Sequence, residues 1–292
     1  MNKPYFSIII PTYNRSKQLK FAIDSVVNQT FKNWELILVD NNSKDGTKKL
    51  IDNYNNSKIK IFTINNRGNI AKSRNLGIKK SSGKYLAFLD SDDEWLPEKL
   101  QLSYKILKKK ISLIYHDMYI KKKVDQKFFK KTGYCRNLSN FPYEDLIFNG
   151  PAFPTSSVII KKSIFKKINF FDENKNLITW EDFDAWIRIA KIKSKFYKLK
   201  KTLGYVWIGK ENNLKPRNEI KNIYFFKKKY LNRNINDLPQ WCNLSLMRSF
   251  LKTKRFDQSL KFIKKIKIEK LDLIKKLKIL FFYLIIKLKI SF

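Results

Sequence analysis

Short β-rich apolar runs alternate with helix-patterned segments through the first hundred residues of this 292-residue chain. The runs occupy residues 6–10, 34–39, 59–64 and 85–89, and residues 19–27 between the first two have helical spacing of apolar side chains. This alternation predicts an α/β fold with a mostly parallel central sheet and helices on both faces. In such sheets, ligands bind beyond the carboxyl ends of the strands.

Polar residues follow three of these runs directly. They are Pro11–Asn14, Asp40–Asp45 and Asp90–Asp93. Because the carboxyl ends of parallel strands share one edge of a sheet, we expect these three segments to converge in space.

The most acidic of the three segments contains Asp90, Asp92 and Asp93. Like charges this close repel each other, and a hard divalent cation with oxygen ligands compensates them. Mg²⁺ typically keeps waters and substrate phosphates in its shell, so the segment is a candidate metal–diphosphate site. The alternative is an acidic turn that caps the helix from Pro97.

The second half of the chain is more basic and less regular. We expect strands at 111–115 and 156–160, an irregular basic segment at 121–150, and a helix that opens at Trp180–Asp184. From about Leu214 the pattern is helical and basic to the end. We therefore expect a first domain over residues 1–210 and a basic helical region over 211–292.

The charge balance indicates either an anionic partner or a compositional drift toward Lys. The net charge is +37, and residues 211–292 carry +15 of it. Of the 62 basic residues, 53 are Lys. Proteins that recognise nucleic-acid bases and phosphates favour Arg, so nucleic acid is an unlikely partner. A membrane surface is the preferred one. The tail over 254–292 interleaves Lys with large apolar residues, so we expect it to lie on an anionic leaflet or to pack on the protein.

The two cysteines, Cys135 and Cys242, have no metal-type spacing and imply a reducing compartment. No signal-peptide pattern and no apolar run of about 20 residues is present. We expect a cytoplasmic protein that attaches peripherally to the inner face of the cytoplasmic membrane.

Five motifs occur together in a fixed order. They are Ser7–Arg15, Asp40–Thr47, Arg74-Asn75-x-Gly77, Asp90–Asp93, and Glu181-Asp182 with Trp186 and Arg188. In order and spacing they resemble family 2 glycosyltransferases of the GT-A fold over residues 6–190. The resemblance implies an inverting transferase that moves a sugar from a nucleotide-sugar, usually a UDP-sugar, with Mg²⁺ or Mn²⁺. We expect a saccharide or lipid-linked saccharide acceptor in surface polysaccharide or glycan synthesis.

The resemblance also implies roles for individual residues. Asp182 would be the general base, with Glu181 in reserve, unless these acids only cap a helix. Asp92 would hold the metal, assisted by Asp90 or Asp93. The nucleotide-sugar candidates are Pro11, Thr12, Tyr13, Asn14, Asp40, Asp45, Arg74, Asp90 and Ser91. The acceptor-side candidates are Trp95, Trp180 and Thr155.

One departure and two alternatives remain. Many relatives carry a Tyr-Arg-x-His-like segment, whereas this chain has Tyr205–Lys210 without a His, so Lys210 or Arg217 would have to compensate. The only histidine, His116, is interpreted as structural. A Rossmann dehydrogenase is excluded because the first loop lacks Gly-x-Gly-x-x-Gly. The other alternative is a non-catalytic protein that binds nucleic acid or membrane on the same scaffold.

Overall fold

A computed structural model describes residues 3–109, 111–122, 135–174, 177, 179–209, 215–231, 238–270 and 273–290. The chain forms two compact units. The sheet unit comprises Met1–Tyr143, Ala152–Glu173 and Glu181–Asn213, and the helical unit comprises Glu144–Pro151, Asn174–Trp180 and Leu214–Phe292. Two short segments from the first 210 residues therefore belong to the helical unit, which a division at a single boundary does not anticipate.

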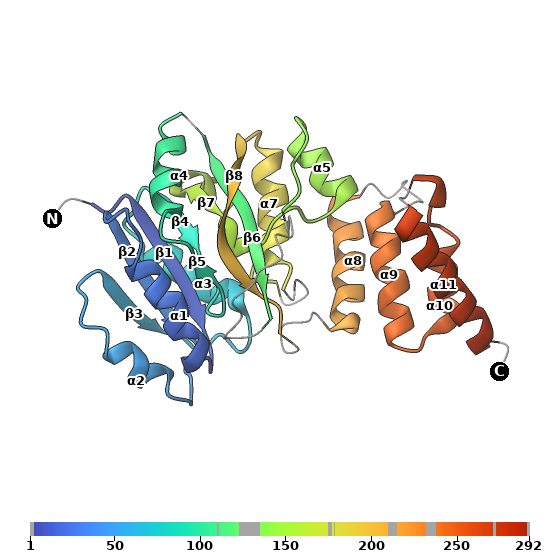
Figure 1. The fold of residues 1–292 in the computed structure, drawn as a ribbon, viewed down its shortest axis with the longest axis horizontal. Helices are drawn as coiled ribbons and strands as arrows, with labels where there is room; N and C mark the ends of the chain where they lie inside the picture. The colour runs from blue at the N-terminus through green and yellow to red at the C-terminus, as the bar shows by residue number, and fades with distance from the viewer. Residues whose placement is uncertain are drawn as a thin grey trace. The chain divides into compact units, whose positions relative to one another are not determined.

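The sheet unit is built on one eight-stranded sheet in the order β3-β2-β1-β4-β7-β6-β8-β5 (Figure 1). Strands β3, β2, β1 and β4 are mutually parallel, as the alternating pattern predicts. Strand β7 is antiparallel to β4 and β6, β8 is parallel to β6, and β5 is antiparallel to β8. The strands are β1 (Phe6–Thr12), β2 (Trp34–Asp40), β3 (Ile59–Thr63), β4 (Tyr85–Phe88), β5 (Glu94–Trp95), β6 (Leu113–Lys121), β7 (Ile159–Lys161) and β8 (Phe196–Trp207).

Helices cover both faces of this sheet. On one face α1 (Ser16–Val27) packs its buried residues into the core with Ile8 and Leu36. On the other face lies α3 (Ile70–Lys80), where a Cβ on Gly77 would come within 2.6 Å of Ile9 Cγ2. A glycine at this position is what allows α3 to approach β1 so closely. Successive strand residues thus point to opposite faces, and both faces are buried, which explains the unbroken apolar runs.

The remaining elements complete the two units. The sheet unit also contains α2 (Thr47–Asp52), α4 (Lys99–Leu107), the 3₁₀ turn η1 (Thr155–Ser157), α6 (Lys162–Lys167) and α7 (Glu181–Lys191). The helical unit contains α5 (Pro142–Asn149), α8 (Pro216–Tyr230), α9 (Gln240–Lys252), α10 (Phe256–Ile263), η3 (Ile268–Lys270) and α11 (Leu273–Ile290). The C-terminal pattern of basic helices agrees with this arrangement. Across the described parts of the chain, every helix is too short or too rich in charge to cross a bilayer.

Several segments differ from the sequence-based expectation. The strand expected at 156–160 begins only at Ile159, because residues 155–157 form the 3₁₀ turn η1. The longest strand, β8, was not expected, because lysines interrupt its apolar residues and leave the strand half exposed. The segment 121–150 was expected to be irregular, yet β6 reaches Lys121 and α5 begins at Pro142. A proline at the first helical position and acids in the first turn are the signals that could have identified α5. Residues 123–134 of that segment lie outside the described residues.

Candidate active site at the carboxyl edge of the sheet

The loops that follow β1 and β2 are tied together at the carboxyl edge of the sheet. The backbone N–H of Asn14 donates to Ser43 Oγ at 2.9 Å, and Asn14 Oδ1 accepts from the Lys44 N–H at 2.7 Å. Asp45 Oδ2 accepts from the N–H of Ser16 at 3.0 Å. The first two of the three predicted segments therefore do converge.

Asp40 and Asp45 both hold their own loop in shape. Asp40 accepts from the Ser43 hydroxyl at 2.5 Å, and Asp45 accepts from the hydroxyl and the N–H of Thr47. Burial alone would raise the pKa of Asp45, but the hydrogen bonds from Thr47 and Ser16 outweigh it and lower the pKa. Both acids thus support their loop through hydrogen bonds, and their contact with a nucleotide stays a prediction.

The four residues Pro11–Asn14 do not have equal access to solvent. Pro11 and Thr12 are buried and pair in register with Val39 and Asp40 of β2. Tyr13 is 54% exposed, and Asn14 is exposed with a left-handed φ of 48°. Of these four residues, Tyr13 and Asn14 are the two exposed to solvent, while Pro11 and Thr12 form the buried strand end.

Arg74 of α3 joins the end of β4 to the start of α7. Its Nη2 lies 2.6 Å from Asp90 Oδ1, and its Nη1 donates to Glu181. The guanidinium is almost fully buried; burial opposes its charge, yet Asp90 and Glu181 raise the pKa of Arg74 above its ordinary value. Arg74 is therefore the buried link between the Asp90 segment and the Glu181-Asp182 pair, rather than a surface charge.

Asp182 is the more accessible acid of the Glu181-Asp182 pair. Glu181 is buried against Arg74, whereas Asp182 is partly exposed and accepts from Thr155 Oγ1 at 2.5 Å and from the Phe183 N–H at 2.7 Å. Burial raises the pKa of Asp182, and burial raises that of Glu181 to about 7 although Arg74 opposes it. A carboxylate with a raised pKa and partial exposure suits general-base chemistry.

Thr155, predicted on the acceptor side, is the hydroxyl partner of Asp182, and its contact with an acceptor stays a prediction. Its hydrogen bond stabilises the ionised carboxylate and so lowers the pKa of Asp182. We expect Thr155→Val to raise that pKa, so that the base becomes protonated at a higher pH. The acidic limb of the pH profile of kcat should then move to higher pH, whereas Thr155→Ser, which keeps the hydroxyl, should leave it in place. An unmoved limb in Thr155→Val would show that Asp182 is not the titrating base.

The carboxylates of the Asp-x-Asp segment have separate partners. Asp92 forms an ion pair with Arg15, and Asp90 with Arg74. Asp93 is 4% exposed and accepts from the Trp207 N–H of β8 at 2.8 Å. Burial, together with the charges of Asp92 and Asp90, raises the pKa of Asp93 well above its ordinary range. Asp93 is thus a structural residue that holds β8 near β5, and its predicted metal role is not supported by this placement.

The two carboxylates that remain as candidate ligands for a divalent cation are those of Asp90 and Asp92. Within the described ranges no group of three His, Cys, Asp or Glu side chains is arranged to hold a metal ion. Two hard oxygen ligands do fit Mg²⁺ or Mn²⁺ when substrate phosphates and waters complete the shell. In this structure Arg15 and Arg74 are the cationic partners of the two carboxylates.

The two tryptophans predicted on the acceptor side both pack against other parts of the protein. Trp95 is 3% exposed, donates from Nε1 to the Ser156 carbonyl at 2.8 Å, and lies under Lys99 Nζ at 3.6 Å from the ring centroid. Trp180 belongs to the helical unit and packs against Trp241 at 5.7 Å. The acceptor prediction is wrong for Trp95, because its ring has no free face toward solvent.

Two contributors to this edge were not assigned a role from the sequence. Arg15, at the end of the first motif, pairs with Asp92. Ser156 Oγ accepts a hydrogen bond from the backbone N–H of Asp90 at 3.0 Å. Arg15 could have been singled out only as the charged residue that ends the first motif, and Ser156 carries no sequence signal. Ser91 is buried beside them.

His116 is buried within β6, and burial lowers its pKa well below the usual value, which agrees with a structural role. Lys210 lies outside the described residues.

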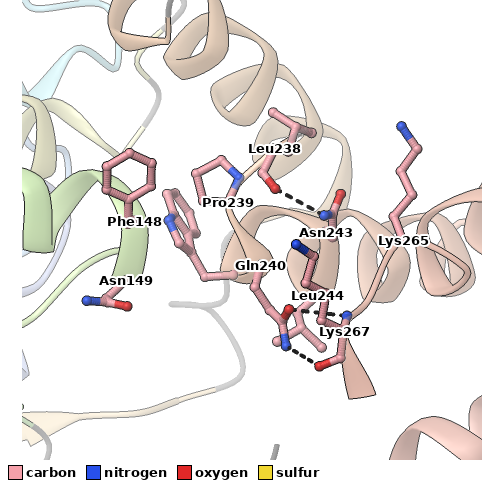
Figure 2. Close-up of a pocket in the computed structure, with 10 residues that line it drawn as sticks. Phe148, Asn149, Leu238, Pro239, Gln240, Asn243, Leu244, Lys265 and Lys267 are labelled. Atoms are coloured by element: carbon pink, nitrogen blue, oxygen red, sulfur yellow. Dashed lines mark hydrogen bonds between the residues drawn. The ribbon is translucent and has the colours of Figure 1, made fainter. Parts of the chain in front are cut away.

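The helical unit has a separate pocket of about 540 Å³ (Figure 2). Its wall includes Gln240, which exchanges two hydrogen bonds with the backbone of Lys267 and so fixes the segment after α10. The other lining residues are Phe148, Asn149, Leu238, Pro239, Trp241, Asn243, Leu244 and Lys265. None of the site residues predicted from the sequence lines this pocket.

Comparison with known proteins gives the family. The sequence matches Glycosyl transferase family 2 over residues 7–169, more than half of the chain. It is 33% identical over 207 residues to an uncharacterized glycosyltransferase of Rickettsia typhi, covering 66% of this chain and 61% of that protein. A relative from Rickettsia bellii is matched over only 26% of its length, so the chain corresponds to part of these longer proteins.

Two further likenesses concern a named enzyme and a solved structure. The chain is 31% identical over 190 residues to UDP-Glc:alpha-D-GlcNAc-diphosphoundecaprenol beta-1,3-glucosyltransferase WfgD of Escherichia coli, covering 63% of this chain and 69% of that protein. The structure of S. aureus TarS 1-349 in complex with UDP-GlcNAc superposes with a TM-score of 0.62 at 21% identity, over 90% of this chain and 82% of that one. The second likeness shows a shared GT-A fold. By its sequence match and its sheet topology, this chain is a member of glycosyl transferase family 2.

Proposed function

We propose that this chain is an inverting glycosyltransferase that moves a sugar from a nucleotide-sugar, preferably a UDP-sugar, to a saccharide or lipid-linked saccharide acceptor in surface polysaccharide or glycan synthesis. The observation that carries the proposal is the Arg74 bridge, which joins the donor-side Asp90 to the pair that contains the candidate base. The name of the E. coli relative, which specifies a UDP-linked donor and a diphosphoundecaprenol acceptor, supports the same classes of substrate.

The donor would bind along the loops after β1 and β2. Tyr13 offers an exposed aromatic ring to the nucleotide base, and Asn14 offers its side-chain amide beside it. Asp40 and Asp45 keep these loops in place through their hydrogen bonds to Ser43 and Thr47. Recognition of the base would therefore depend on loop residues that the acids pre-organise.

The leaving group is a nucleoside diphosphate, whose negative charge grows as the glycosidic C–O bond breaks. Asp92 and Asp90 would hold Mg²⁺ or Mn²⁺, which stabilises that charge when bound. Arg15 and Arg74 already lie against these carboxylates. The two arginines hold these carboxylates in place through their ion pairs.

Inversion requires the acceptor hydroxyl to attack the anomeric carbon opposite the leaving diphosphate. Asp182 would take the hydroxyl proton on its carboxylate as the new C–O bond forms. Hydrogen bonds from the Thr155 hydroxyl and the Phe183 N–H orient that carboxylate. The adjacent Glu181 is held in an ion pair with Arg74. The sugar is thus transferred with one bond made, one broken and one proton moved to Asp182.

Binding of UDP with a metal tests this proposal against the non-catalytic alternative. We expect UDP with Mn²⁺ to raise the unfolding temperature of the wild type, because a ligand at 100 times its Kd stabilises by about 2.7 kcal/mol. Asp92→Asn should keep the fold, lose the metal-dependent part of this shift and lose most transfer activity, since an amide is a weaker ligand for a hard cation. Asp52→Asn, at the exposed end of α2, is the matched control and should behave as wild type. A full metal-dependent shift and normal turnover in Asp92→Asn would refute the Asp-x-Asp assignment, and a wild type that UDP does not stabilise would favour the non-catalytic alternative.

A further inference from the structure

Helix α11 has two apolar faces. One face is buried, with Ile279 at 4% and Ile286 at 0% exposure. The other carries seven large apolar side chains that are each at least 53% exposed: Leu273, Ile274, Leu277, Leu280, Phe281, Leu284 and Leu288. A helix that packs on its own unit with one face has no need of a second apolar face for that packing.

The seven exposed residues form one continuous stripe, called here the apolar stripe. At 3.6 residues per turn they fall within an arc of about 120° along the whole helix. An arc of that width, repeated over five turns, is the pattern of a helix that buries one side in an apolar medium.

The charges beside the apolar stripe all have one sign. Residues 273–290 contain five lysines and no acid. On the helical wheel, Lys276 and Lys287 border one side of the stripe and Lys278 borders the other, while Lys289 lies farther round the helix from the stripe. Lysines on both borders of an apolar face can extend their ammonium groups toward phosphate headgroups while their alkyl chains stay with the apolar residues.

We propose that the apolar stripe of α11 docks this protein on an anionic lipid leaflet, with the helix lying in the plane of the membrane. The biological purpose of this docking rests on the proposed function: it would place a transferase for lipid-linked acceptors at the surface where such acceptors reside. A spanning role is excluded for this helix, whose 18 residues include five lysines. A second protein copy would bring the two rows of lysines toward each other, so a lipid surface is the better electrostatic match.

Vesicle co-sedimentation of the full chain tests the docking surface. The wild type should pellet with phosphatidylcholine vesicles that contain phosphatidylserine, and less at high salt. Leu277→Gln with Phe281→Gln and Leu284→Gln should lower the partition coefficient by about tenfold or more, because three inserted side chains become polar. The control is Tyr224→Gln with Ile268→Gln, which changes exposed apolar residues elsewhere in the same unit and should bind as wild type.

Three outcomes would decide the matter. Equal binding of the stripe variant and the control, or no binding by the wild type, overturns the proposal. A wild type that is dimeric in light scattering and a stripe variant that is monomeric would also overturn it, since the stripe would then be a contact between copies. The unfolding midpoint of the stripe variant should match the wild type, because the altered side chains are exposed.

Sugar transfer is measured separately on a water-soluble acceptor, so loss of the proposed activity and loss of docking are distinguishable.

Discussion

Replacing Asp182 with asparagine is expected to lower the rate of sugar transfer by about 10²–10⁴-fold, the usual cost of removing a general base. The amide can still accept from Thr155 and from the Phe183 N–H, so the start of α7 should keep its shape. It cannot take the acceptor's proton. Steady-state kinetics should therefore show a lower kcat, with the affinity for UDP close to that of the wild type.

The control and the contrary results separate the roles that Asp182 can have. Asp52→Asn makes the same chemical change at an exposed position in the sheet unit and should leave kcat unchanged. Weaker UDP binding with normal kcat in Asp182→Asn would place this residue in the donor site. A lower unfolding temperature with normal kinetics would mean that Asp182 only caps α7.

Replacing Arg74 with methionine is expected to destabilise the fold by about 3–5 kcal/mol, the usual cost of leaving buried charges without their partner. Arg74 and Glu181 are 4% and 5% exposed at their side chains, so water cannot replace the lost guanidinium. Asp90 is 33% exposed and should contribute less to this loss. Urea unfolding of the purified protein measures the change.

A second substitution identifies the cause of that loss. Arg74→Met combined with Glu181→Gln removes both charges of the buried pair, so the double variant should be more stable than Arg74→Met alone. If the second substitution recovers nothing, the loss comes from packing, and the bridge between the Asp90 segment and α7 is not held by charge.

The central strands could be predicted because their residues are buried on both faces. Ile8, Ile9 and Ile10 are all fully buried in β1. A strand that is buried on both faces appears in the sequence as an unbroken run of β-branched residues. The convergence of the Asn14 and Asp45 loops followed from the shared edge of parallel strands.

The roles of adjacent acids could not be predicted, because they depend on partners far away in the chain. Asp92 and Asp93 are neighbours, yet Asp92 pairs with Arg15, while Asp93 is buried against the backbone of Trp207, 114 residues later. That partner belongs to β8, the strand that was not expected from the sequence because lysines interrupt its apolar residues. Trp95 was misassigned for a similar reason, since the carbonyl that accepts from it is that of Ser156, in the segment just before β7.

The most direct test of the central claim is nucleoside diphosphate release from a panel of UDP-sugars and other nucleotide-sugars, with Mg²⁺ or Mn²⁺ and saccharide or lipid-linked acceptors. We predict that the wild type turns over at least one nucleotide-sugar, preferably a UDP-sugar, and that Asp182→Asn releases the diphosphate about 10²-fold more slowly or worse. Absence of release from every donor in the wild type, or an equal rate in Asp182→Asn, would contradict the account.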